Sequence, residues 1–183
     1  MTLHWLIATA LIVNIGLGLY MSEILPDHDP LHSTILQLHE PLGLTVLVLS
    51  VARVVWRLIN PAPPLPASVP RAERVLAHTV HFLLYFLIVA IPLTGWAMVS
   101  SSRNLAPISY FGLFFWPNLT AVAELSRSHR VLLHHGFNTA HVILAFSAIA
   151  LVPVHIGAAF LHRRRGENVL GRMLPWARIS EPL

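Results

Sequence analysis

The sequence predicts an all-α integral membrane protein, a four-helix bundle in a single domain. Of its 183 residues, 55% are hydrophobic and only 11% are charged, whereas about 25% of residues in a soluble domain are charged. Its mean hydropathy is +0.66. Four apolar stretches are each long enough to cross a hydrocarbon core of about 30 Å at a rise of about 1.5 Å per residue. The expected spans are about 3–21, 38–58, 75–99 and 131–162.

The first span lies at the start of the chain, where a signal peptide is the main alternative. Residues 1–22 contain no charged side chain apart from the titratable His4. A signal peptide has a positive start and an apolar region of only about 7–15 residues. No Lys or Arg precedes this apolar run. We therefore interpret it as a membrane helix.

The other spans are bounded by charge and proline. The second ends near Arg53 and Arg57, which can extend toward the lipid headgroups, and a proline-rich connector follows it. The third contains Pro92, which is expected to bend it. An outer loop is expected at 100–130, with its aromatic stretch 110–117 in the membrane interface. The chain is expected to end in a basic tail, 163–183.

Arginine distribution predicts the orientation, because cytoplasmic loops are enriched in basic residues. The connection between the first two spans has no Arg, whereas the second connector and the tail have many. These basic residues are Arg53, Arg57, Arg71, Arg74, Arg163, Arg164, Arg165, Arg172 and Arg178. Both termini are thus expected in the cytoplasm of a bacterial inner membrane, with the outer loop facing the periplasm.

Composition also excludes several functions. The chain has no cysteine, which excludes disulfides, thiolate nucleophiles, iron–sulfur clusters and cysteine-bound zinc. The net charge of +4 could suggest nucleic acid, but such binding needs a basic stripe on a solvated surface. Here the arginines flank apolar runs, so we expect a lipid bilayer and no nucleic acid partner.

Histidine is the unusual residue, with twelve copies against eight acidic residues. Intramembrane histidines are costly and are functional candidates. His141 and His155 are 14 residues apart, which is about 21 Å and nearly four whole helical turns. They therefore project from nearly the same face of the fourth span at two depths. The topology places His4 at the depth of His155, and His39 at the depth of His141.

Paired imidazoles at two depths favour two haems. Two trans imidazoles fill the axial positions of haem iron, and the flat macrocycle fits between the helices of a bundle. Zinc would need four converging ligands, and each depth supplies only two. A lone His near a helix end is more often an interfacial residue. It is the agreement of all four depths that supports ligation.

Other polar residues have candidate roles with ordinary alternatives. His134, seven residues before His141, is a rival ligand without a partner 14 residues further on. Residues that could bind quinone near the cytoplasmic side are His78, His81 and His162. Arg53 could pair with a haem propionate. Residues that could attract a small anion are Arg103, Arg127 and Arg130. Interfacial anchoring explains the quinone candidates equally simply, and Arg53 could equally mark the cytoplasmic side. For His134 and for the three outer arginines the ordinary explanation, an interfacial residue or a solvated loop, is the simpler one.

These residues bring a family into view. The sequence resembles the bacterial cytochrome b561 family over nearly its whole length. The stretches that carry the resemblance are Leu3-His4-Trp5, Leu38-His39 with Gly43, Leu76-Ala77-His78 with His81 and Tyr85, His141 to His155 with His162, the connector with Arg57, and Leu170 to Pro175. Each stretch alone is weak, but their order and spacing are fairly specific.

The resemblance implies a quinone-linked electron carrier of the inner membrane with two haem b groups. It implies His4 with His155 as ligands of the inner haem, and His39 with His141 as ligands of the outer haem. The chain looks most similar to the small bacterial members, whose characterised type is a superoxide oxidase. Such an enzyme passes electrons from periplasmic superoxide to ubiquinone.

Three hypotheses follow. The first is a haem-dependent membrane oxidoreductase that takes electrons from superoxide to ubiquinone. The second is a membrane cytochrome b subunit that passes electrons between quinone and a separate dehydrogenase or hydrogenase. The third is a haem-free ion transporter based on histidine. Optical spectra of the oxidised and reduced protein distinguish the first two from the third.

Overall fold

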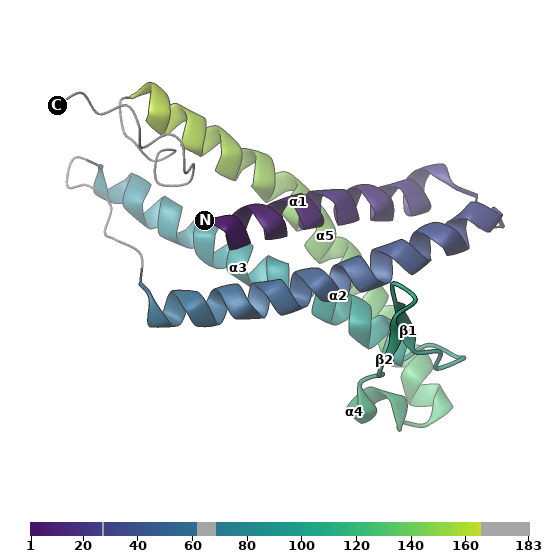
Figure 1. The fold of residues 1–183 in the computed structure, drawn as a ribbon. Coiled ribbons are helices and arrows are strands. Elements are labelled where there is room, and N and C mark those ends of the chain that lie inside the picture. Colours follow the sequence, from purple (N-terminus) through teal and green to yellow (C-terminus); the bar gives the residue numbers. More distant parts are fainter. Residues whose placement is uncertain (27, 62–68, 166–183) are drawn as a thin grey trace.

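The computed structural model describes residues 1–26, 28–61 and 69–165. Most of the predicted tail and of the proline-rich connector lie outside these residues. Four helices dominate the fold, and each is long and apolar enough to cross a membrane (Figure 1). The molecule is therefore a helical membrane bundle, as predicted. Many large apolar side chains face outward, which suits lipid contact.

The first two helices form an antiparallel pair. Helix α1 (Thr2–Leu19) continues into a π-helical turn, η1 (Tyr20–Ile24), and the backbone becomes extended at Leu25. Helix α2 (Pro30–Ile59) begins at a proline, and the Asp29 side chain accepts a hydrogen bond of 2.8 Å from the backbone N–H of Leu31. An aspartate cap followed by proline is a favoured helix start. This cap places the start of α2 before the expected span at 38–58.

The second pair of helices is longer. Helix α3 (Arg71–Ser100) contains Pro92 within it, and α5 (Arg127–Arg164) has 38 residues. At about 1.5 Å per residue, α5 extends well beyond a hydrocarbon core of about 30 Å. Ser126 caps its start by accepting a hydrogen bond from the backbone N–H of His129. The segment predicted as an outer loop therefore ends a few residues before 130.

Helices that follow one another in the chain pack together: α1 on α2, α2 on α3, and α3 on α5. Two apolar clusters hold them. Ile7, Leu11, Val46 and Ile88 join α1, α2 and α3. Leu87, Ile91 and Ala148 join α3 and α5. Within the described residues, α1 and α5 approach each other at few backbone positions.

The two ends of the bundle differ. The terminal end, on the left in Figure 1, has the start of α1 and the end of α5. There an Arg165 Nη1 atom lies 2.9 Å from a Glu73 carboxylate oxygen, which links the end of α5 to the start of α3. The opposite, hairpin end has two short antiparallel strands, β1 (Ile108–Tyr110) and β2 (Phe114–Trp116), and the single turn α4 (Thr120–Ala123).

Candidate functional site

Four histidines form two pairs, one toward each end of the bundle. The terminal-side pair is His4 on α1 and His155 on α5, whose ring centroids are 6.4 Å apart. The hairpin-side pair is His39 on α2 and His141 on α5, whose ring centroids are 6.1 Å apart. These are the four residues that the sequence singled out. The 14-residue spacing on α5 places one partner in each pair.

The separation of the rings suits a shared metal. Two imidazoles on opposite sides of one metal, each with a metal–nitrogen distance of about 2.0 Å, have centroids roughly 6.3 Å apart. Both measured separations are close to this value. Rings that packed directly would meet at any distance within the usual range of about 4.5–7 Å. Within the described residues, no group of three or more His, Asp or Glu side chains could hold a metal ion.

Backbone carbonyls orient both rings of the hairpin-side pair. The Nδ1–H of His39 donates to the carbonyl of Asn14 at 3.1 Å. The Nδ1–H of His141 donates to the carbonyl of Ile91 at 2.9 Å, and the Thr94 hydroxyl lies 3.2 Å from the same nitrogen. Because Nδ1 carries the proton, Nε2 keeps its lone pair. This is the tautomer that a metal-binding histidine needs.

Two glycines make room for these rings. A Cβ atom on Gly18 would lie 3.2 Å from Cε1 of His39, and a Cβ atom on Gly95 would lie 3.2 Å from Cε1 of His141. Gly43 plays a similar part beside the Asn14 side chain, at 3.3 Å. Sequence reasoning missed Gly18 and Gly95, although glycine inside a helix often marks close packing.

The hairpin-side pair lies in a cavity lined by α1, α2, α3, β1 and α5. Its lining includes Asn14, His39, Glu40, Ile108 and His141. The Asn14 side-chain Oδ1 atom is buried and has no hydrogen-bond partner among the described residues. Buried polar atoms are nearly always paired, so this one points to a group that the described residues do not supply. His39 and His141, which both line this cavity with an unprotonated Nε2, are the donor set that would hold a haem.

The terminal-side pair has a third histidine beside it. The ring centroid of His81, on α3, is 5.4 Å from that of His155. This makes His81 a rival to His4 as the partner of His155, which the sequence did not indicate. Arg53 interacts electrostatically with His4, His81 and His155. The Cζ atom of Arg53 lies 5.6 Å from the centre of the Tyr85 ring, in cation–π range.

The sequence of the whole chain identifies what this arrangement belongs to. The profile described as prokaryotic cytochrome b561 matches residues 1–176. The chain belongs to the prokaryotic cytochrome b561 family. Its members are membrane electron-transfer proteins that bind haem b, and this chain is accordingly a multi-pass bacterial membrane redox protein.

Three curated relatives match this chain in sequence over three quarters of its length or more. Cytochrome b561 homolog 2 of Escherichia coli K12 is 33% identical over 173 residues, covering 93% of this chain and 86% of the relative. A probable superoxide oxidase, CybB of Yersinia pestis, is 30% identical over 142 residues, covering 75% and 73%. Cytochrome b561 homolog 1 of Escherichia coli K12 is 25% identical over 177 residues, covering 94% and 93%.

The other candidate residues of this b561 protein lie at both ends of the bundle. Arg103 and Arg127 are exposed at the hairpin end. Arg130 donates from Nη1 to the Ser102 carbonyl at 2.7 Å. His134 lies nearby, where its Nδ1 is 3.0 Å from the Met98 carbonyl. The same kind of bond orients His39 and His141, so it does not distinguish His134 from a ligand. What distinguishes it is its neighbour, because the ring of His134 lies against His135, whereas His39 and His141 lie against each other.

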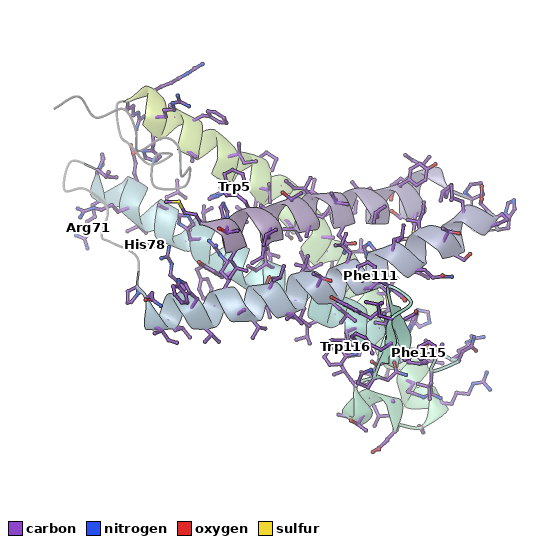
Figure 2. The ribbon with its side chains drawn as sticks, in the orientation of Figure 1. Trp5, Arg71, His78, Phe111, Phe115 and Trp116 are labelled. Atoms are coloured by element: carbon purple, nitrogen blue, oxygen red, sulfur yellow. The ribbon has the colours of Figure 1, made fainter. Side chains whose placement is uncertain are left out.

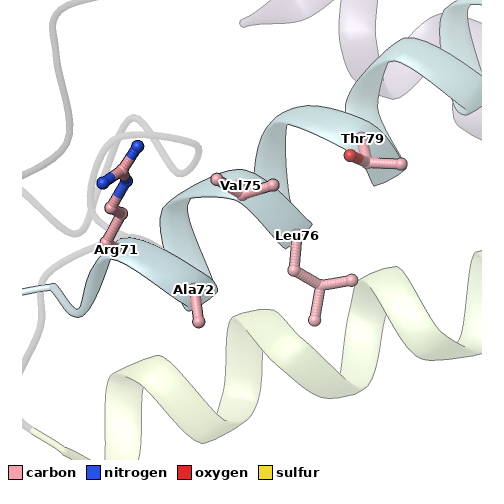
Figure 3. A pocket seen from close by; sticks show the side chains of 5 residues that line it. All are labelled: Arg71, Ala72, Val75, Leu76 and Thr79. Atoms are coloured by element: carbon pink, nitrogen blue, oxygen red, sulfur yellow. The ribbon is translucent and has the colours of Figure 1, made fainter.

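The candidate quinone residues lie at the terminal end. His78 is exposed on α3, close to Arg71 and on the side opposite the hairpin (Figure 2). His162 is half-buried near the end of α5. A shallow apolar hollow runs along the first turns of α3 (Figure 3). Its lining residues are Arg71, Ala72, Val75, Leu76 and Thr79. The hollow lies beside the candidate histidines without including them.

Proposed function

We propose that this b561 protein holds two haem b groups and carries electrons from superoxide to ubiquinone. His39 and His141 would hold the haem nearer the hairpin, and His4 and His155 the haem nearer the termini. The observation that supports this most strongly is the pairing of four imidazoles at two levels, with separations of 6.1 and 6.4 Å. When bound, haem iron supplies one-electron chemistry.

The protein's own contribution is to fix the ligands. The carbonyls of Asn14 and Ile91 hold the two hairpin-side rings in one tautomer. Such bonds restrict ring rotation and increase the basicity of Nε2. Both rings are half-buried among α1, α2, α3 and α5, and the polarity of this cavity would help to set the reduction potential of a bound haem.

The donor side is proposed from charge and from the comparisons. Superoxide is a small anion, and the three arginines at the hairpin end would raise its local concentration. The name of the Yersinia pestis relative supports the same substrate. Each superoxide gives up one electron and becomes molecular oxygen. Two superoxide anions and two protons therefore convert one ubiquinone to ubiquinol.

The acceptor side is proposed at the terminal end. His78, His81 and His162 are there, and an imidazole can donate a hydrogen bond to a quinone carbonyl and transfer a proton near neutral pH. Arg53, beside the terminal-side pair, is the candidate partner of a haem propionate, because arginine pairs well with carboxylates in partly buried places.

Haem content is the first test. Purified protein should show a sharp reduced α-band of b type, and pyridine haemochrome analysis should give two haems per chain. His141→Ala should lose one of the two, whereas the matched variant His134→Ala, on the same helix, should keep both. A colourless protein, or His141→Ala with full haem content, would refute the ligand assignment.

Substrate is tested separately. Superoxide generated in a pulse should reduce the haems of the isolated protein at a rate that falls as ionic strength rises, since steering by exposed arginines is screened by salt. Replacing Arg103 and Arg127 together by Gln should slow this reduction and leave the spectra unchanged. Reduction by superoxide only in the presence of a co-purifying dehydrogenase or hydrogenase would instead indicate a cytochrome subunit.

A further inference from the structure

The hairpin reaches membrane depth. The Tyr110 hydroxyl, at the end of β1, lies 3.0 Å from the Thr45 hydroxyl on α2. Helix α2 has 30 residues, which is about 45 Å at 1.5 Å per residue. Thr45 is at its midpoint. Wherever a hydrocarbon core of about 30 Å lies along such a helix, the midpoint falls inside it. The Tyr110 hydroxyl is therefore level with lipid acyl chains, and it anchors the end of β1 to that depth.

One face of the hairpin is fixed to the bundle. Ile108 is 3% exposed and lines the cavity of His39 and His141. The indole N–H of Trp96 donates to the Pro117 carbonyl at 2.9 Å, and the rings of Trp96 and Trp116 meet edge to face. The hairpin is thus held in place from both of its strands.

The turn and the second strand are apolar and uncovered. Leu113 is 78% exposed, Phe115 71%, Phe114 50% and Phe111 45%. Figure 2 shows Phe111 and Phe115 on the hairpin, away from the terminal end that carries His78. The aromatic residue Phe111 has a φ of 52°, which is unusual for a bulky side chain. A polar turn residue would be less strained, so the strain is consistent with a requirement for apolar side chains.

The hairpin satisfies part of its backbone by its own pairing. Non-helical backbone at membrane depth must satisfy its polar groups within the protein. Here the two strands pair with each other, and the turn closes with the Leu113 N–H donating to the Tyr110 carbonyl at 3.0 Å. The residues at the centre of this turn, Phe111 and Gly112, both have positive φ, as in the tight turns that suit β-hairpins.

We propose that residues 108–116 form a re-entrant hairpin: Ile108 closes the hairpin-side histidine cavity, and the Phe111–Phe115 tip contacts the acyl chains of the adjacent leaflet. The tip is apolar, follows a residue that is anchored to the middle of α2, and is uncovered by the described residues. Lipid is therefore the occupant that the position favours over a second copy of the chain. The inference does not depend on the electron donor or acceptor.

The test uses the absence of native cysteine. Leu113→Cys would carry a nitroxide in protein reconstituted into phospholipid vesicles. Collision rates with oxygen and with a water-soluble nickel chelate would be measured by electron paramagnetic resonance. Matched single-cysteine controls are Ile12→Cys, exposed in the middle of α1, and Ala121→Cys, exposed on α4 outside the spans. Phe115→Cys provides a second tip position if the first variant does not fold.

The expected result is a tip that behaves like position 12. Its collision rate with the nickel chelate should be several-fold lower than at position 121, and its collision rate with oxygen should be high. A chelate collision rate equal to that at position 121 would overturn the proposal, because the tip would then be in water. Shielding from both reagents would also overturn it, because protein would then cover the tip.

Discussion

At the residue scale, the orientation of the His39 and His141 rings is set by backbone carbonyls and by glycines beside the rings. Backbone carbonyls on α1 and α3 accept the Nδ1–H bonds of His39 and His141. A side-chain substitution does not remove a backbone carbonyl, so these two hydrogen bonds should persist when Asn14 or Ile91 is replaced. The glycines beside the rings differ, because any other residue there adds a Cβ atom close to a ring. Substituting them therefore tests how closely the rings are packed.

Gly18→Ala should disturb the hairpin-side pair. Its Cβ would press on the His39 ring at 3.2 Å, whereas a Cβ on Gly16, on the same helix, meets nothing within 4 Å. Gly16→Ala should stabilise α1 by up to about 1 kcal/mol through helix propensity, with unchanged spectra. Gly18→Ala should shift the low-spin ferric electron paramagnetic resonance signal of one haem. Equal signals from both variants would contradict this crowding.

His155 has two neighbouring imidazoles, and a second pair of variants separates them. His4→Ala should lose the terminal-side haem, because the His4–His155 separation of 6.4 Å is the one near the roughly 6.3 Å of a shared metal. His81→Ala should retain both haems, because its ring is only 5.4 Å from that of His155. Haem content per chain is the measurement. Loss of one haem from His81→Ala alone would reassign the ligand.

The pairing of the histidine rings could be predicted from the sequence, but the groups that orient and neighbour those rings could not. The spacing of His141 and His155 depends only on helical geometry, and topology supplies the partners. The carbonyl acceptor at Asn14 has no sequence signal, because every residue carries one. His81 was assigned to the terminal end, but its approach to His155 depends on the rotation of α3 against α5. Periodicity does not determine that rotation.

At the element scale, four helices were predictable because long apolar runs have few alternatives in a membrane. The start of α2 was less obvious, although Asp29-Pro30 is a good helix start. The aromatic stretch 110–117 forms a hairpin against α2 that the sequence did not predict, and its predicted position in the membrane interface stays a prediction. A turn centred on Phe111-Gly112 lacks the Asn-Gly signal that usually marks such turns.

The bond between the hairpin and α2 has a measurable energy. Tyr110→Phe should lower the free energy of unfolding by about 1 kcal/mol, the usual net value of a hydrogen bond. Thr45→Val removes the other partner, and it also removes the bond from Thr45 to the Pro41 carbonyl. The double variant should therefore cost less than the sum of the two single variants. Strict additivity in thermal unfolding would mean that the two hydroxyls do not interact.

At the scale of the whole molecule, neither of the two buried apolar clusters joins the first helix, α1, directly to the last helix, α5. They join α1, α2 and α3, and separately α3 and α5, whereas α1 and α5 are brought together at His4 and His155. A ligand held between these two residues would join the first and last helices, and one between His39 and His141 would join α2 to α5. Ligand binding and bundle closure are therefore coupled, because a group that binds only the folded state stabilises it.

The orientation of the bundle decides which pair meets the donor. The connection before α2 has no arginine, whereas Arg53, Arg57 and Arg71 lie on or near the connector after it. This asymmetry predicts the terminal end in the cytoplasm. His28 is exposed before α2 and Asn60 is exposed after it. Replacing either one by cysteine would report on which side of the membrane that position lies. The chain has no native cysteine that would give background labelling.

An impermeant maleimide added to intact spheroplasts should label His28→Cys and leave Asn60→Cys unlabelled. Asn60→Cys should react only after the membrane is permeabilised, and detergent-solubilised protein serves as the control for thiol reactivity at both positions. Under that topology the hairpin-side pair is the first that an external donor meets, and the arginines at the hairpin end face that donor. The reverse labelling pattern would place His4 and His155 on the outer side, and superoxide generated outside the cell would then meet the wrong end of the bundle.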